Sequence, residues 1–224
     1  MARLTILHDS FGPALADEVA EVAPAVLAAL VDRSLVGVEP ASGRLHWHPF
    51  AHEFARRQAM LDESAARRSR ERLVRHVVAR LQRLGADEHN AGAESLAWLE
   101  REWAHVVNAW RAALDEGRHA DWGVLAEAIG LRHEIQARYR DGAALLALAD
   151  EAPQADEAAA QAAARVAVVR ARLEHWLDNE TARASLDAVQ PRLERWGDEA
   201  GLAAALRVRG LVEWRLGHAE QALT

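Results

Sequence analysis

Residues 176–185 (WLDNETARAS) and residues 214–223 (WRLGHAEQAL) decide the fold of this chain. Both segments have Trp at the first position and Ala at the ninth, so each pair is offset by 38 residues (214 − 176 and 222 − 184). Asn179 in the first segment takes the place of Gly217 in the second, and both residue types tolerate the left-handed backbone of a turn. The last third of the chain is therefore predicted to contain a repeated unit of helices.

Helical patterns extend from this repeat back to Glu63, and no strand is predicted in that region. The spacing of apolar residues predicts helices over about 64–84, 92–116, 121–138, 141–152, 155–177, 180–196 and 199–216. Glycines fall at or near the breaks, as expected for helix C-caps and turns. They are Gly85, Gly117, Gly142, Gly197 and Gly217.

The first 60 residues have a different pattern. After a short apolar segment, residues 13–22 and 24–31 have helical spacing. Residues 35–38 and 44–47 are rich in β-formers and flank a turn cluster, which predicts a β-hairpin. A helix over 50–60 follows. The predicted fold class is mainly α, with a winged-helix-like module that carries a small β-hairpin, followed by an α-helical repeat arm.

The small residues of the last third resemble those of a tetratricopeptide repeat. Gly210, Gly217 and Ala222 stand where that repeat needs small side chains for close helix packing, although Arg209 stands where it usually has Leu. A repeat near 38 residues, rather than 34, implies longer helices. Because each such unit needs a neighbour to bury its apolar face, we expect an unpaired face near Thr224, and either a fragment or a frayed last helix.

These patterns predict a division into three parts. Residues 1–61 form the winged-helix-like module, which we expect to be truncated at its N-terminus. Residues 62–91 form a basic connecting helix. Residues 92–224 form the tetratricopeptide-like arm, which we expect to be truncated at its C-terminus.

The composition excludes several classes of enzyme. The 224 residues carry a net charge of −7 and contain no Cys, and all 27 basic residues are Arg. The chain therefore has no disulfide, no thiol nucleophile, no thiolate zinc site and no phosphate-binding or Schiff-base lysine. The apolar run in residues 1–8 is too short for a signal peptide, and no uncharged 18-residue stretch is present, so a cytoplasmic protein without a membrane span is expected.

Most of the chain resembles one family of regulators. Residues 4–11, 30–36 and 45–55 look like the winged-helix segment that follows the ATPase core in signal-transduction ATPases with numerous domains (STAND proteins). These include bacterial transcriptional regulators of the maltose-activator and antibiotic-regulator types and, more distantly, plant resistance proteins. Residues 98–114 resemble the helix that opens their sensor arm, and residues 187–206 are similar to their inter-repeat pattern.

The resemblance implies a non-catalytic regulatory role. In the family, a preceding core binds ADP or ATP, and a His at the start of the last winged-helix helix reaches the phosphates. The matching residue is His48, followed by Pro49 where many members have an acid. No cofactor is implied for this chain itself, which has neither Walker motifs nor a DNA-binding effector. The implied partners are its own ATPase core and an inducer or partner protein, and the parent is expected to oligomerise.

Two clusters of polar residues carry alternative interpretations. His46, His48 and His52 are close enough in sequence to suggest zinc, although no third ligand type is obvious beside them. Residues 56–83 hold nine Arg against three acids, which suggests either DNA binding or a docking surface for an acidic domain. The absence of Lys and of interleaved aromatics argues against nucleic acid. The proposed docking residues are Arg67, Arg68, Arg72 and Arg75.

Aromatic residues and pairs of acidic residues are the remaining candidates for binding or catalytic sites. Trp98, Trp103 and Trp110 lie along one predicted helix, where they either fill the core or face a ligand in a concave arm. The candidate ligand or partner face consists of Trp103, Trp110, Tyr139, Trp176 and Trp214. Acid pairs such as Asp198 and Glu199 fall at helix starts, where acids act as caps. We expect no catalysis by this chain. A plain protein-interaction scaffold and a DNA-contacting winged helix are the competing functions.

Overall fold

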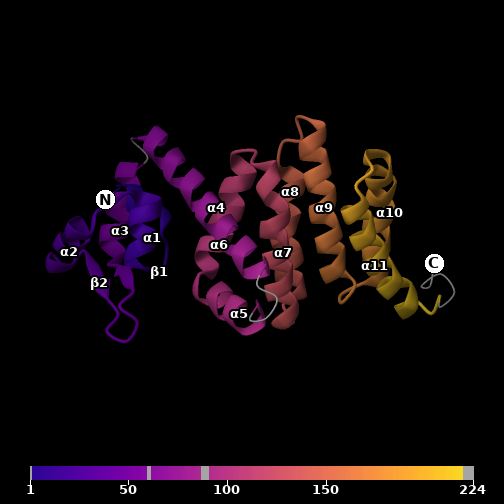
Figure 1. Ribbon diagram of the computed structural model, residues 1–224, viewed down its shortest axis with the longest axis horizontal. Coiled ribbons are helices and arrows are strands. Elements are labelled where there is room, and N and C mark those ends of the chain that lie inside the picture. The colour runs from indigo at the N-terminus through magenta and orange to yellow at the C-terminus, as the bar shows by residue number, and fades with distance from the viewer. Residues whose placement is uncertain (1, 60–61, 87–90, 219–224) are drawn as a thin grey trace. The chain divides into compact units, whose positions relative to one another are not determined.

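The computed structural model describes residues 2–59, 62–86 and 91–218. These residues form eleven α-helices, one short 3₁₀ helix and a three-stranded antiparallel sheet near the N-terminus (Figure 1). The mainly α fold class is thereby confirmed. The chain forms two compact units, residues 1–112 and residues 113–224. The predicted division into three parts stays a prediction.

The sheet of the first unit is built around the predicted hairpin, which is confirmed. β2 (Val36–Val38) pairs antiparallel with β3 (Leu45–Trp47), with Val36 opposite Trp47 and Val38 opposite Leu45. Gly43 has a φ of 66° in the turn, a conformation that favours glycine. A third strand, β1 (Ser10–Phe11), pairs with the other edge of β3. It was missed because two residues are too short to show an alternating pattern.

Five helices of the first unit accompany this sheet. They are η1 (Ala2–Ile6), α1 (Pro13–Ala20), α2 (Pro24–Asp32), α3 (Pro49–Ala59) and α4 (Glu63–Ala86). Three begin at a proline, whose fixed φ and missing N–H suit the first helical turn. α2 packs on β2, and α4 packs on η1 and α1. The core includes Leu4, Leu7, Phe11 and Leu73, all fully buried, and the Trp47 indole donates to the carbonyl of Leu7 at 3.1 Å.

The single helix predicted over 92–116 is two helices. α5 (Ala91–Arg101) and α6 (Trp103–Asp115) are separated at Glu102. Helical hydrogen bonds continue on both sides, from Glu102 N–H to the Trp98 carbonyl at 2.9 Å and from Val106 N–H to the Glu102 carbonyl at 3.0 Å. The break is therefore local. It falls where the Glu102 carboxylate accepts from Arg44 at 2.6 Å, a residue 58 positions away that helix patterns do not report.

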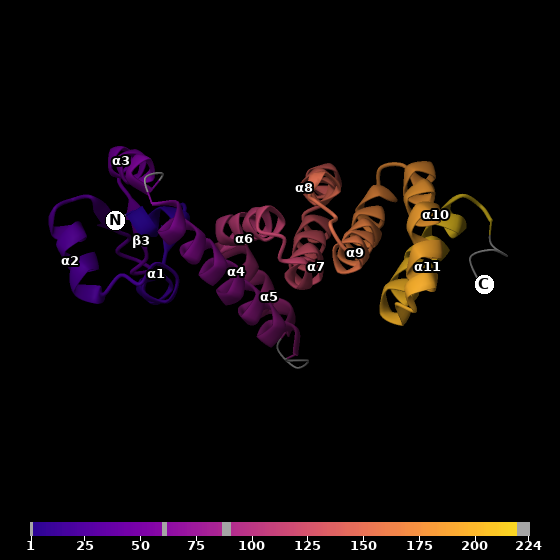
Figure 2. The same ribbon diagram turned by 90° about the horizontal axis from the view of Figure 1, so that it is seen from above.

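The second unit is a sequential stack of helices. It contains α7 (His119–Ile135), α8 (Tyr139–Glu151), α9 (Glu157–Glu174), α10 (Asn179–Trp196) and α11 (Glu199–Arg215). α9 packs against α7, α8, α10 and α11 (Figure 2). Successive helices start 18 to 22 residues apart. This arrangement is consistent with a repeat-like arm. Ala222 and Thr224, used in the repeat argument, lie outside the described residues.

Two kinds of glycine organise the second unit. Gly117, Gly197 and Gly217 follow helices with φ values of 63°, 63° and 85°, which confirms them as turn glycines. Gly142 instead lies inside α8, which corrects its prediction as a turn glycine. A Cβ atom there would stand 2.7 Å from both His133 and Leu173. Gly142 is therefore required by close helix packing. Within the described residues, no helix combines the length and the apolar character needed to cross a membrane.

Candidate functional site

His48 stands at the junction between β3 and α3, with its side chain exposed. Its N–H donates to the Leu35 carbonyl at 3.1 Å, which fixes the backbone. Its ring stacks on Phe50, with centroids 5.7 Å apart and an interplanar angle of 29°. Phe50 is 83% exposed and Phe54, four residues further along α3, is 59% exposed. Residues four apart share a helix face, so His48, Phe50 and Phe54 form one aromatic surface on α3.

Sequence reasoning did not single out Phe50 and Phe54. Apolar residues in a short helix are normally assigned to the core, and the buried side of α3 is instead formed by Ala51 and Ala55. The sequence did contain a signal for this arrangement. Ala51 and Ala55 are four residues apart and therefore share one side of the helix, which leaves the larger Phe50 and Phe54 on another side. Exposed aromatic side chains that adjoin each other are unusual on a protein surface and mark interaction sites.

The three neighbouring histidines do not form a metal site. His46 lies against Gly37, where a Cβ would stand 2.3 Å from its Nε2. His52 instead packs against His8 and Trp47, with centroid distances of 5.2 and 5.5 Å. Among residues 2–59, 62–86 and 91–218, no three His, Asp or Glu side chains are arranged to hold a metal ion.

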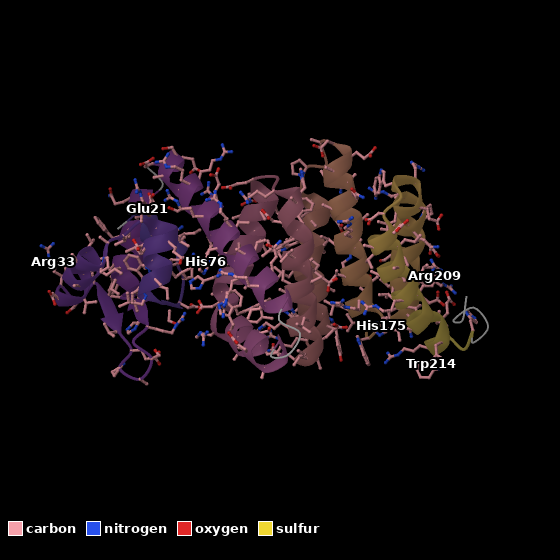
Figure 3. All side chains as sticks on the ribbon, in the orientation of Figure 1. Glu21, Arg33, His76, His175, Arg209 and Trp214 are labelled. Carbon is pink, nitrogen blue, oxygen red and sulfur yellow. The ribbon has the colours of Figure 1, made fainter. Side chains whose placement is uncertain are left out.

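The basic residues of α4 are partly neutralised by acids. Arg67 pairs with Glu71 at 3.3 Å, and Arg72 pairs with Glu21 at the end of α1. Glu21, labelled in Figure 3, also accepts from Arg3 at 2.9 Å. The hydrogen bond from Arg72 is the main cause that lowers the pKa of Glu21. Arg68 and Arg75 are exposed, and neither forms an ion pair with a described acid. The predicted docking face thus carries two unpaired and two paired guanidinium groups.

A buried ionic network lies between the hairpin and α6. Arg44 donates to Glu102 at 2.6 and 3.1 Å, and its Nε donates to Ser10 Oγ at 2.9 Å. His105 Nδ1 lies 2.8 Å from Glu102. Burial alone would raise the pKa of Glu102, but the hydrogen bonds and charges of His105 and Arg44 outweigh it and lower the pKa to about 2. No sequence signal could have found this network, because its members have no common motif.

The predicted aromatic face is only partly assembled. Trp98 and Trp110 are buried in the first unit, so Trp110 belongs to the core rather than to an exposed face, as the packing interpretation expected. Trp103 is half-buried on α6 in the same unit.

In the second unit, Tyr139 and Trp176 are brought together. Their rings stack with centroids 5.2 Å apart and an interplanar angle of 10°. The Arg215 guanidinium lies 4.1 Å from the Trp176 centroid. Trp176 is thus held by two neighbours and is still 45% exposed. This stack joins α8, the turn after α9 and α11.

Trp214 does not join this stack. It lies at the C-terminal end of α11 (Figure 3) and is 68% exposed. Ile135 and Leu177 are also exposed, near the ends of α7 and α9. The second unit therefore presents apolar side chains to solvent where successive helices end. No protein-family model, no curated protein and no solved structure matches the chain.

Proposed function

We propose that this chain is a non-catalytic regulatory and sensor segment of a nucleotide-switched signalling ATPase, of the type found in bacterial STAND transcriptional regulators. In this proposal the N-terminal module is a winged helix that restrains the ATPase core, and the helical arm receives an inducer or a partner protein. The observation that carries the proposal is the aromatic surface of His48, Phe50 and Phe54 on α3.

The chemistry of this surface suits a nucleotide-bound partner. His48 occupies the position at which the family places a His that reaches the phosphates, and its imidazole is exposed. An imidazole N–H is a good donor to a phosphate oxygen. Phe50 and Phe54 would lose exposed apolar area on docking, which favours association. In this proposal the ATPase core, and not this chain, binds and hydrolyses the nucleotide.

The arm supports the sensing half of the proposal. Exposed Ile135, Leu177 and Trp214 lie at helix ends of the second unit, and apolar side chains of this kind favour protein or ligand contact. An inducer changes the switch only if it binds the released state more tightly than the restrained state. Release then allows the core to oligomerise. No cofactor is proposed for this chain alone.

A plain interaction scaffold is the second candidate, favoured by the same exposed side chains of the arm. The two functions differ in the role of α3, because a scaffold does not require its aromatic surface. DNA binding is less well supported, since the chain has no Lys and residues 56–83 have no Phe, Tyr or Trp interleaved with their arginines.

The proposal is tested by binding of the 224-residue chain to the ATPase core that the same gene is expected to encode upstream, where a Walker lysine loop should be found. Affinity for the core is measured with ADP and with a non-hydrolysable ATP analogue. We expect tighter binding with ADP, and a loss of about tenfold or more in Phe50→Ala/Phe54→Ala. Arg207→Gln, at an exposed position of α11, is the control. Equal affinities in both nucleotide states, or an absent core, favour the scaffold.

A further inference from the structure

We infer that the first unit binds a small anion in a pocket bordered by η1, α3 and α4. The pocket has a volume of about 170 Å³. It is lined by side chains from all three elements: Arg3, Thr5, Ile6, Arg56, Ala59, Glu63, Ala66, Ser69 and Arg70. This inference goes beyond the proposed function and uses none of the residues of the aromatic surface on α3.

Three arginines from three different elements give the pocket its charge. Each is paired with a glutamate whose side chain is exposed. The pairs are Arg3–Glu21 at 2.9 Å, Arg56–Glu53 at 3.0 Å and Arg70–Glu63 at 2.5 Å. Exposed pairs of this kind contribute little to stability, because water screens their charges. An anion that enters the pocket therefore replaces these partners with little loss.

Ser69 is the observation that points to a ligand. It lies in α4 and is only 1% exposed. Its Oγ forms no hydrogen bond with any described residue, although a helical serine can bond the carbonyl four residues before it. Buried hydroxyl groups are normally hydrogen-bonded, because an unmade bond is unfavourable. An oxygen of a bound anion supplies the acceptor that Ser69 lacks.

The size and walls of the pocket limit the ligand. A cavity of about 150 Å³ holds a molecule the size of benzene, whereas drug-sized ligands occupy about 300–1,000 Å³. A complete nucleotide is therefore too large. Ile6, Ala59 and Ala66 provide apolar wall beside the arginines. The ligand class is a compact anion, a phosphate or carboxylate group on a short apolar part.

Glu63 provides an internal control, because it is the one acid among the described residues that line the pocket. Its carboxylate competes with the anion for Arg70 and repels an anion nearby. Removal of this charge should strengthen binding, whereas loss of a guanidinium should weaken it. Arg75 lies exposed on the same helix outside the pocket, so Arg75→Gln changes the net charge equally without changing the site.

The test titrates the complete 224-residue chain with inorganic phosphate and, separately, with propionate. Chloride keeps the ionic strength constant, and amide shifts of α4 and the thermal midpoint are recorded. We expect saturable binding of at least one probe. Arg70→Gln should weaken it about tenfold, and Ser69→Ala several-fold, as for hydrogen bonds to charged groups. Glu63→Gln should tighten it several-fold, and Arg75→Gln should leave it within about twofold of the wild type.

The two probes distinguish the head groups: tighter phosphate binding assigns a phosphate ligand, and tighter propionate binding assigns a carboxylate. The inference is overturned if neither probe saturates. It is also overturned if Arg75→Gln loses as much affinity as Arg70→Gln, because the effect would then be one of net charge. Since Glu63→Gln alters only an exposed side chain, its expected gain keeps the test decisive even if Ser69→Ala unfolds.

Discussion

Arg165 on α9 and Asp198 at the start of α11 form a two-point ion pair, with Nε 2.6 Å from Oδ2 and Nη2 2.7 Å from Oδ1. The Asp198 carboxylate is also the N-cap of α11, since it accepts the Gly201 N–H at 3.1 Å. The hydrogen bond from Arg165 is the main cause that lowers the pKa of Asp198. The Asp198 carboxylate thus caps the N-terminus of α11 and also links α11 to α9 through the ion pair with Arg165.

Substitution of Asp198 should separate these two roles. Asp198→Asn keeps an N-capping side chain but removes the charge, and we expect it to lower the free energy of unfolding by about 1 kcal/mol. Asp198→Ala removes both interactions and should lower it by about 2–3 kcal/mol. Urea unfolding followed by circular dichroism measures both. The exposed pair Glu180–Arg183 is the control, and Glu180→Gln should cost less than about 0.5 kcal/mol. A loss in Asp198→Ala no larger than the control contradicts this assignment.

Glu102 should make the first unit acid-sensitive. Its pKa of about 2 lies below the ordinary 4.5, so the unfolded chain takes up a proton first as the pH falls. The stability that Glu102 contributes is complete above pH 4.5 and is lost as the pH falls toward 2. We expect Glu102→Gln to lower the free energy of unfolding by about 1–3 kcal/mol at pH 7, and this difference should shrink by pH 3. A difference that is constant with pH would show that the ionised carboxylate is not the cause.

Buried histidines predict a second, milder pH dependence. Burial is the main cause that lowers the pKa of His8, His133 and His175 below 6.5. The unfolded state therefore binds protons more readily, so stability is complete above pH 6.5 and decreases as the pH falls below it. Each histidine changes the free energy of unfolding by at most about 1.4 kcal/mol per pH unit. His133→Gln should flatten the slope between pH 7 and 5, and an unchanged slope would exclude His133 as a contributor.

Two helical glycines should respond in opposite directions. Gly142→Ala places a Cβ 2.7 Å from His133 and Leu173, and we expect a loss of about 1–3 kcal/mol. A Cβ added at Gly123, within α7, would meet open space beyond its own helix. Gly123→Ala should therefore gain about 0.5–1 kcal/mol from the lower entropy of the unfolded chain. Thermal unfolding of both variants measures the contrast, and losses of similar size would rule out close packing as the reason for Gly142.

Much of the fold follows from local signals. Prolines 13, 24 and 49 mark helix starts, and glycines 117, 197 and 217 mark helix ends, because these residues act through their own backbone. Glu102 and β1 could not be predicted in this way. The break at Glu102 coincides with an ion pair to Arg44, and β1 exists only by pairing with β3. Both depend on residues distant in sequence.

The candidate site, like the fold, was predictable only where local sequence determines the structure. Pro49 placed His48 at a helix start, but the exposure of Phe50 and Phe54 depends on which side of α3 is covered. The missing hydrogen bond of Ser69 depends on three-dimensional packing alone. Local sequence therefore indicates where an element begins, whereas burial and pairing decide which side chains remain available for binding.

The role of His48 is tested most directly by the rate of ADP release from the intact regulator that joins this segment to its ATPase core. Wild type, His48→Ala and the control Arg207→Gln are loaded with labelled ADP and chased with unlabelled nucleotide. We expect about tenfold faster release, or more, from His48→Ala, as for the loss of a hydrogen bond to a charged phosphate. Arg207→Gln should match the wild type. Equal release rates in wild type and His48→Ala would contradict restraint of the nucleotide-bound core by this residue.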